Sequence, residues 1–433
     1  MRPLVLHLSG DYPDPVRNRT TFAVKNFIDR LEDCDHVVVS IKRRSNPRDC
    51  YCRVFPPADG VQVVALGYFA PPGGLFHRTM MRLLARRVAG IVARLGVRPD
   101  LVMAHKLTIE GVVAHALWQK SGIPYACSIR GEVEEKFLRF KPGLARHVGE
   151  VVRESEALYF VSAWFENVIA RRYPGLARRK ARLPNFISGA ITPCHAPWDP
   201  DALLTVLDLN MYRRKGFPEL VAGLAWARRT NPRLRLDVIG WSSPRTMRLV
   251  ERMVARAGVA DAVRFLGVMK HEDVLAQMPR YAALVLPAKN ETFGMVYAEA
   301  LLSGVPILYA QNSGIDGYVD DLDVGVRVPA GDFLAVAEGL LRLSAGGAKY
   351  RRGIRENYEA LRARFAPEPC LADFRTMLGR AQRRAKRLGL AGIAAVPTTA
   401  FMEGQHAIAR NLGTGMGTQR AGQSALGGAL RSR

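Results

Sequence analysis

Residues 287–299 read Pro287-Ala288-Lys289-Asn290-Glu291-Thr292-Phe293-Gly294-Met295-Val296-Tyr297-Ala298-Glu299, directly after the apolar run Ala283–Leu286. The run predicts a buried strand, the polar residues a short loop, and Gly294 the start of a helix that carries Glu299. Free amides at a helix start bind diphosphates or sugar hydroxyls, and a glycine lets the ligand approach closely. Glu291 could accept hydrogen bonds from a sugar, and Glu299 from a ribose diol. The alternative is a carboxylate pair on a solvated helix face.

A second strand-loop-helix pattern has the sequence Leu207-Asp208-Leu209-Asn210-Met211-Tyr212-Arg213-Arg214-Lys215-Gly216-Phe217. A strand ends here, a basic loop turns at Gly216, and a helix begins. Lys215 and its neighbours Arg213 and Arg214 lie where positive charge would stabilise a leaving diphosphate, and such stabilisation is usually the largest catalytic contribution. The alternative is a solvated cluster of charges.

Short aliphatic runs alternate with helical patterns along the chain. Near-continuous apolar strands between helices predict parallel sheets covered on both faces, hence an α/β fold with two Rossmann-like, doubly wound domains. Because ligands in such sheets bind beyond the carboxyl ends of the strands, we expect a central cleft between the domains. The first domain is predicted over 1–188 and the second over 189–366, followed by a helix over 367–388 and a basic, disordered low-complexity tail over 389–433.

The pattern also places the individual elements. The predicted strands are Leu4–Leu8, Val37–Ile41, Val61–Leu66, Asp100–Ala104, Tyr125–Ile129, Leu158–Val161, Leu203–Leu207, Leu234–Ile239, Val263–Leu266, Ala283–Leu286 and Pro306–Tyr309. The predicted helices are Thr21–Leu31, Leu75–Leu95, Ile109–Lys120, Leu144–Ser155, Ala163–Arg172, Phe217–Arg229, Arg245–Ala257, Met295–Ser303, Phe333–Ser344 and Arg351–Phe365.

Composition and charge narrow the function classes. Hydrophobic residues make up 48% of the 433 and charged residues 24%, and no apolar run approaches the ~18–20 residues of a membrane span. The six cysteines and nine histidines have no metal-binding or redox spacing, so we expect free thiols in a reducing cytoplasm and no metal. The net charge of +24 favours nucleic acid, an anionic membrane or phosphorylated small molecules as partners. Aromatic and basic residues do not interleave in the way that is typical of RNA-binding segments. The sequence therefore does not predict specific nucleic-acid binding.

Together the two loop segments resemble the retaining group 1 glycosyltransferases, which have the GT-B fold. Residues 213–216 resemble the family's phosphate-binding Lys-Gly loop, and residues 291–299 its paired-glutamate motif with Phe293-Gly294 inside it. Val238-Ile239-Gly240 resembles the family's strand-to-glycine turn. Val263-Arg264-Phe265-Leu266-Gly267 is similar to its base-contacting strand and loop. In the family the last helix crosses back onto the first domain.

The resemblance implies transfer of a sugar from a nucleotide diphosphate sugar with retained anomeric configuration. It implies no cofactor, no obligatory metal and no protein nucleophile, the leaving phosphate taking the acceptor proton. Lys215 with Arg213 or Arg214 would hold the phosphates, and Glu291 the sugar. The catalytic candidates are Lys215, Glu291 and Arg213. The donor-binding candidates are Arg214, Gly216, Gly240, Leu266, Gly267, Phe293, Gly294, Met295 and Glu299.

Two segments depart from the family's pattern. The family usually has Gly-Arg five to six residues before the lysine, where this chain has Leu209-Asn210, so the diphosphate would depend more on the neighbouring arginines. After the mid-domain strand the family often has a histidine, where this chain has Arg130, which cannot act as a base and would act through its charge alone. His105, at the end of a predicted strand, either lines the cleft or is a buried structural histidine.

The helical pattern Leu75–Leu95 has an apolar stripe and, on another face, a row formed by Arg78, Arg82 and Arg86. This pattern indicates either packing on a sheet with solvated arginines or docking on anionic lipid. The predicted function is a cytoplasmic glycosyltransferase, peripheral at the inner membrane face in the docking alternative, that acts on a glycan or lipid-linked acceptor in polysaccharide or glycolipid biosynthesis. The alternative is a catalytically degenerate GT-B protein that binds nucleotides or polyanions.

Overall fold

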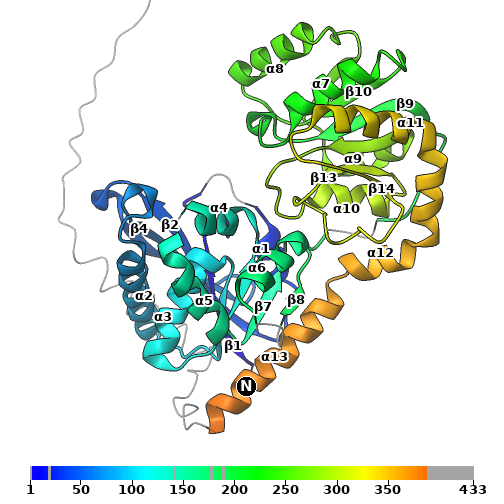
Figure 1. Ribbon diagram of the computed structural model, residues 1–433. Helices are drawn as coiled ribbons and strands as arrows, with labels where there is room; N and C mark the ends of the chain where they lie inside the picture. The colour runs from blue at the N-terminus through cyan, green and yellow to red at the C-terminus, as the bar shows by residue number, and fades with distance from the viewer. Residues whose placement is uncertain are drawn as a thin grey trace, which may run out of the picture.

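The protein forms two lobes, each built around one central sheet with helices on both faces (Figure 1). The structure, a computed structural model, describes residues 2–17, 21–140, 142–174, 180–187, 191–194 and 196–387. The first sheet has eight strands and the second has six. The predicted α/β class with two doubly wound sheets is confirmed. The predicted tail over 389–433 lies outside the described residues.

The first sheet has the strand order β3-β4-β2-β1-β5-β6-β7-β8 and is parallel except for the pair β3·β4. Every residue of β1 (Leu4–Ser9) is buried, because β2 and β5 flank it and helices cover both faces. The other strands are β2 (Asp35–Arg44), β3 (Tyr51–Val54), β4 (Val61–Phe69), β5 (Leu101–Ala104), β6 (Tyr125–Ile129), β7 (Ala157–Phe160) and β8 (Lys180–Arg182). The helices are α1 (Ala23–Ile28), α2 (His77–Arg94), α3 (Val112–Ser121), α4 (Glu132–Phe140), α5 (Ala145–Glu154) and α6 (Glu166–Arg172).

The second sheet is parallel throughout, in the order β11-β10-β9-β12-β13-β14. Its centre is the fully buried strand β12 (Tyr281–Leu286), which lies between β9 and β13. The other strands are β9 (Asp199–Val206), β10 (Arg235–Ile239), β11 (Val263–Gly267), β13 (Ile307–Ala310) and β14 (Gly325–Val328). The helices are α7 (Phe217–Ala227), α8 (Pro244–Arg256), α9 (His271–Gln277), α10 (Met295–Leu302), α11 (Phe333–Glu356) and α12 (Tyr358–Phe365).

The last described helix, α13 (Glu368–Arg387), runs from the second lobe back along the first, as Figure 1 shows. Its buried Phe374 packs against the rings of Phe27 and Tyr159. Further into the helix Arg375 pairs with Asp33 at 2.9 Å, and nearer its C-terminus Arg384 Nη1 lies 2.7 Å from Glu156 Oε1. Cationic and aromatic contacts therefore tie the crossover helix to the first lobe.

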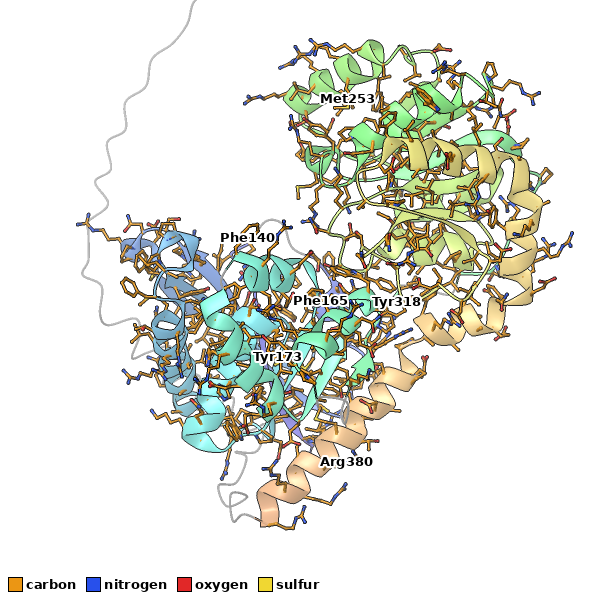
Figure 2. The ribbon with its side chains drawn as sticks, in the orientation of Figure 1. Phe140, Phe165, Tyr173, Met253, Tyr318 and Arg380 are labelled. Atoms are coloured by element: carbon orange, nitrogen blue, oxygen red, sulfur yellow. The ribbon has the colours of Figure 1, made fainter. Side chains whose placement is uncertain are left out.

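The two lobes also meet beside the cleft, where Tyr318 lies at the junction (Figure 2). The Tyr318 hydroxyl lies 3.2 Å from the carbonyl oxygens of Phe160 and Val161. The Ser162 hydroxyl lies 2.6 Å from the carbonyl oxygens of both Arg130 and Thr292, one in each lobe. This junction holds the loop after β12 next to the first lobe.

Some elements differ from the sequence-based expectation. Strands β3, β8 and β14 were not predicted, because each has only three or four residues and none contains a continuous apolar run; β3 and β8 are mostly exposed, and only Val326 and Val328 of β14 are buried. Helices predicted over 333–344 and 351–365 are instead the continuous α11 and the short α12. The glycine at 347 does not break α11 but makes room for Trp198, whose ring lies 2.4 Å from where a Cβ would be. None of the helices in the described part of the chain is both long and apolar enough to span a membrane.

Candidate active site

A cavity of about 1390 Å³ opens between the lobes, at the carboxyl ends of strands from both sheets. Residues that follow β1, β5 and β6 line one side, and residues that follow β9, β10 and β12 line the other. The charged residues of this lining are Asp11, Lys106, Arg130, Asp208, Arg214, Lys215, Glu291 and Glu299, together with the imidazole of His271. The predicted central cleft therefore exists, and it collects side chains from distant parts of the chain.

The two predicted loops lie in direct contact on the second-lobe side of the cavity. Gly216 precedes α7 with φ +70°, and a Cβ there would lie 2.0 Å from the carbonyl oxygen of Pro287. Only glycine fits this position, because both the backbone conformation and the close approach exclude a side chain. The amide of Lys289 also donates to the carbonyl oxygen of Arg214 at 2.7 Å. The backbone thus holds the basic loop against the glutamate loop.

The Nζ atom of Lys215 contacts Oε2 of Glu291, and both side chains are largely buried, at 20% and 12% exposure. The loop that carries Glu291 is supported from behind. The backbone amide of Glu291 donates to the Ser313 hydroxyl at 2.8 Å, and the amide of Gly314 donates to the Glu291 carbonyl at 2.9 Å. Lys215 and Glu291 are therefore presented to the cavity as one rigid ion pair.

Glu299 lines the cavity from α10, which begins just after Gly294. Its carboxylate is 9% exposed, and its Oε1 lies 3.1 Å from Nε2 of His271 at the start of α9. Sequence reasoning missed His271. Its position, four residues beyond the Gly267 loop, is the only signal that could have found it. The pair places a carboxylate and an imidazole beside each other on the second-lobe side of the cavity.

The two arginines before Lys215 point in different directions. Arg214 lines the cavity, whereas Arg213 does not. Arg213 is exposed, its Nε donates to the Tyr212 hydroxyl at 2.9 Å, and its guanidinium lies 5.6 Å from the Tyr212 ring centre. The Arg213 side chain is thus engaged with Tyr212 rather than with the cavity, whereas Arg214 lines it.

The departure at Asn210 has a structural explanation. Its Oδ1 accepts hydrogen bonds from the Ser243 amide and the Thr246 hydroxyl, both at 3.0 Å, and its amide nitrogen donates to Asp208 at 2.7 Å. Neither Asn210 nor its buried neighbour Leu209 lines the cavity. Asn210 instead ties the loop after β9 to the start of α8.

The remaining donor-side candidates fall into two groups. Gly240, Gly294 and Met295 line the cavity. Leu266, Gly267 and Phe293 lie outside its lining. Phe293 is fully buried and packs against Tyr318, with ring centres 5.2 Å apart, while the Gly267 carbonyl accepts the Gly240 amide at 2.8 Å. Phe293 and Gly267 therefore contact residues next to the cavity rather than the cavity itself.

The first-lobe side of the cavity is formed by Asp11, Lys106 and Arg130. Lys106 Nζ lies 2.8 Å from Asp11 Oδ2. Burial alone would raise the pKa of Asp11, but the charges of Lys106 and Arg130 hold this pKa below its ordinary value. Arg130 Nε donates to the His105 carbonyl at 3.1 Å, which leaves the rest of its guanidinium facing the cavity. The first-lobe side of the cavity therefore presents the cations of Lys106 and Arg130 together with the Asp11 carboxylate.

His105 itself does not reach the cavity, so its candidate cleft role is corrected in favour of the structural one. Its ring is 2% exposed and lies 3.1 Å from Nδ1 of His7, whose Nε2 lies 3.0 Å from His36. His36 Nε2 donates to the Leu31 carbonyl, which fixes the direction of the whole chain of neutral imidazoles. Burial lowers the pKa values of His7 and His36, and that of His105 to about 3.

Among the residues with described positions, no group of three or more His, Cys, Asp or Glu side chains could hold a metal ion. The six cysteines form no disulfide, and Cys34, Cys127 and Cys370 are buried.

Comparison with known proteins agrees with this geometry. Residues 205–360 match the family model "Glycosyl transferases group 1", a range that contains the Lys-Gly loop and both glutamates. The chain is 29% identical over 396 residues to the glycogen synthase of Mycobacterium tuberculosis, covering 86% of this chain and 91% of that protein. The resemblance to group 1 glycosyltransferases is thereby confirmed over residues 205–360, the part of the second lobe that carries the site.

Solved structures show the same architecture. Sucrose-phosphate synthase from Thermosynechococcus elongatus superposes with a TM-score of 0.65 at 20% identity, covering 90% of this chain and all of that one. The Anabaena protein HepE in complex with UDP superposes with a TM-score of 0.60 at 15% identity, covering 90% of this chain and all of that one. The chain has the GT-B fold.

Proposed function

We propose that this protein transfers a sugar from a nucleotide diphosphate sugar to a glycan or lipid-linked acceptor, with retention of the anomeric configuration. The observation that carries the proposal is the meeting of Lys215, Glu291 and Glu299 in one cavity, on segments that follow β9 and β12. A cation for the diphosphate and carboxylates for sugar and ribose hydroxyls are complementary to such a donor.

The donor side of the proposal assigns each group a part. Lys215 and Arg214 stabilise the diphosphate as negative charge develops on it. Glu291 accepts hydrogen bonds from the sugar hydroxyls while it orients the Lys215 ammonium. Glu299, held by His271, accepts hydrogen bonds from the ribose diol, and Gly240 leaves room for the nucleoside.

The retaining step needs no base from the protein. The bond between the anomeric carbon and the diphosphate oxygen breaks, and the acceptor oxygen bonds to the same face of that carbon. The acceptor proton passes to the leaving phosphate oxygen, so charge and atoms balance. Arg130, which has no proton-accepting group, stabilises charge from the first-lobe side.

The similarity to a glycogen synthase supports a glycan acceptor and a role in polysaccharide biosynthesis. The HepE structure contains UDP, which supports a uridine donor as the first to test. Exposed Leu75, Phe76 and Leu83 lie beside the arginines of α2, which supports the membrane-docking alternative for a cytoplasmic protein. Co-sedimentation with anionic but not neutral vesicles tests that alternative.

A second candidate function is nucleotide or polyanion binding without transfer. It is favoured by Leu209-Asn210, which place no cation where the family has an arginine, and by Arg130, which cannot replace the family's histidine. A protein of this kind would bind a nucleotide diphosphate but leave nucleotide sugars intact.

Nuclear magnetic resonance of donor turnover separates the two functions. Wild-type protein is incubated with UDP-glucose, ADP-glucose or GDP-mannose, with and without maltooligosaccharides, and the new anomeric signal is recorded. Release of nucleoside diphosphate with retained configuration, lost in Glu291→Gln, supports transfer. Intact donors in the presence of demonstrated nucleotide binding support the degenerate protein instead.

A further inference from the structure

A second cavity, of about 630 Å³, lies in the first lobe beside the cleft. It is formed at the carboxyl ends of β1, β2, β4 and β5. Its polar lining consists of Arg17, Lys42, Arg43, Tyr68, Lys106 and Glu110, together with the backbone of Gly10. Lys106 lines both this cavity and the cleft, so the two spaces adjoin.

Glu110 is a buried carboxylate at this cavity, with 1% of the residue exposed. Its Oε1 accepts the Gly10 amide at 2.7 Å, and a Cβ on Gly10 would lie 3.1 Å from that oxygen. Its Oε2 has no hydrogen-bond partner among the described residues. A buried, ionised carboxylate oxygen without a partner costs free energy unless it takes up a proton or a ligand supplies a donor.

The cations of the lining are not equivalent. Arg17 is occupied, since it pairs with Asp14 at 3.0 Å and donates to the Gly10 and Ile41 carbonyls. Lys42 and Arg43, at the end of β2, are exposed and form no ion pair within the described residues. Arg43 uses its Nε for the Ala70 carbonyl, which leaves its terminal nitrogens for another acceptor. The rim therefore carries two cations that can take an oxyanion.

We propose that this cavity is the acceptor site and that the acceptor bears an anionic group, either a phosphate or a carboxylate. The anion binds Lys42 and Arg43, and a hydroxyl of the same molecule donates to Glu110 Oε2. Because Lys106 lies between the cavities, another hydroxyl of this acceptor reaches the cleft. The inference rests on the proposed transfer function and specifies its substrate class.

The test is calorimetric titration of the full chain at low salt and about pH 8, where Glu110 is ionised although burial raises its pKa to about 7, with and without saturating UDP for the donor side. The probes are inorganic phosphate, glucose 6-phosphate, glucuronate and uncharged glucose. The charge-removing variant is Lys42→Gln/Arg43→Gln, and the matched control is Arg82→Gln/Arg86→Gln on the exposed face of α2, with the same loss of charge.

We expect at least one charged sugar to bind wild type about tenfold more tightly than glucose. Lys42→Gln/Arg43→Gln should remove this preference, whereas the α2 control should keep it. Stronger binding of glucose 6-phosphate than of glucuronate identifies a phosphate acceptor, and the reverse identifies a carboxylate. Glu110→Gln should weaken the charged sugars without weakening inorganic phosphate, which separates the hydroxyl contact from the anion contact.

UDP titration of every variant keeps the two proposals distinguishable. Unchanged UDP affinity shows that the variants are folded and that the donor side is intact. Failure of wild type to bind UDP contradicts the proposed function. If UDP binds normally, any of three results overturns the acceptor inference. These are equal affinity for charged and uncharged sugars, no binding of any anionic probe, and equal effects of the pocket and control variants.

Discussion

The ammonium of Lys215 contacts the carboxylate of Glu291, although 76 positions separate the two residues in the chain. The contact exists because Gly216 lets the basic loop reach the carbonyl of Pro287, at the end of the central strand of the second sheet. The pair faces the cleft beside Glu299. The cation that would stabilise the leaving group is thus positioned before a donor binds, which is the condition for electrostatic preorganisation.

Lys215→Ala should lower the turnover of the preferred nucleotide sugar by about 10²–10³, the loss typical of one preorganised group at a developing charge. Steady-state release of nucleoside diphosphate measures it. The control is Lys349→Ala, which removes an exposed lysine that pairs with Asp323 and does not line the cavity. Equal turnover in the two variants would remove Lys215 from the catalytic set.

Gly216→Ala should destabilise the protein by roughly 1–3 kcal/mol and abolish nucleotide binding, because the new Cβ must displace the Pro287 backbone. Gly258→Ala is the matched control. Gly258 has nearly the same φ, +71°, but nothing lies within 4 Å of its Cβ position. Denaturant unfolding should show a smaller loss for Gly258→Ala, of about 1 kcal/mol, with binding retained. Similar losses in both variants would mean that the two loops are not held by this contact.

Glu299→Ala should weaken binding of the cognate nucleotide about tenfold through loss of its ribose contact. Comparison with the 2′,3′-dideoxy nucleotide makes the test specific. Wild type should discriminate between the two nucleotides, and Glu299→Ala should bind both with similar, weak affinity. Discrimination that survives in the variant would place the ribose elsewhere in the cleft.

Acidification should destabilise the first lobe through its buried imidazoles. The pKa values of His7, His36 and His105 are lowered in the folded state, so the unfolded chain binds more protons below about pH 6.5. The free energy of unfolding therefore decreases as the pH is lowered. Glu110 acts in the opposite direction, because burial raises its pKa to about 7 and the folded state holds its proton between about pH 4.5 and 7.

Glu110→Gln should therefore make stability fall more steeply as the pH is lowered from 7 to 5. The difference from wild type should change by about 1.4 kcal/mol per pH unit in this window. Urea unfolding at pH 7.5, 6 and 5 measures it. Parallel pH profiles for the two proteins would show that Glu110 is ionised normally.

Much of this architecture could be predicted from the sequence, because buried parallel strands are short apolar runs and their carboxyl ends collect functional loops. Lys215, Glu291 and Glu299 each follow such a run, so their meeting was predictable. Which way a side chain points was not. Arg213 and Arg214 are adjacent in sequence, but only Arg214 lines the cavity. Phe293 lies within the paired-glutamate motif, but its ring packs into the core.

Other features depend on contacts that no local pattern contains. His271 reaches Glu299 from a helix start without a strand or glycine signature of its own. Glu110 reads as an ordinary helical glutamate until Gly10, 100 positions away, is placed against it. From the sequence, Asn210 is interpreted as the loss of a phosphate-binding arginine. Its hydrogen bonds to Ser243 and Thr246 instead show that it has a structural role.

Thermal unfolding of the full chain with UDP, GDP and ADP, each compared with Glu299→Ala, tests whether the cavity between the lobes binds a nucleotide. A nucleotide at about 100 times its dissociation constant stabilises the folded state by ~2.7 kcal/mol, which is a readable shift. We predict a shift with one of the three nucleotides in wild type and its loss in Glu299→Ala. No shift with any of them would contradict the assignment of this cavity as a nucleotide-sugar site.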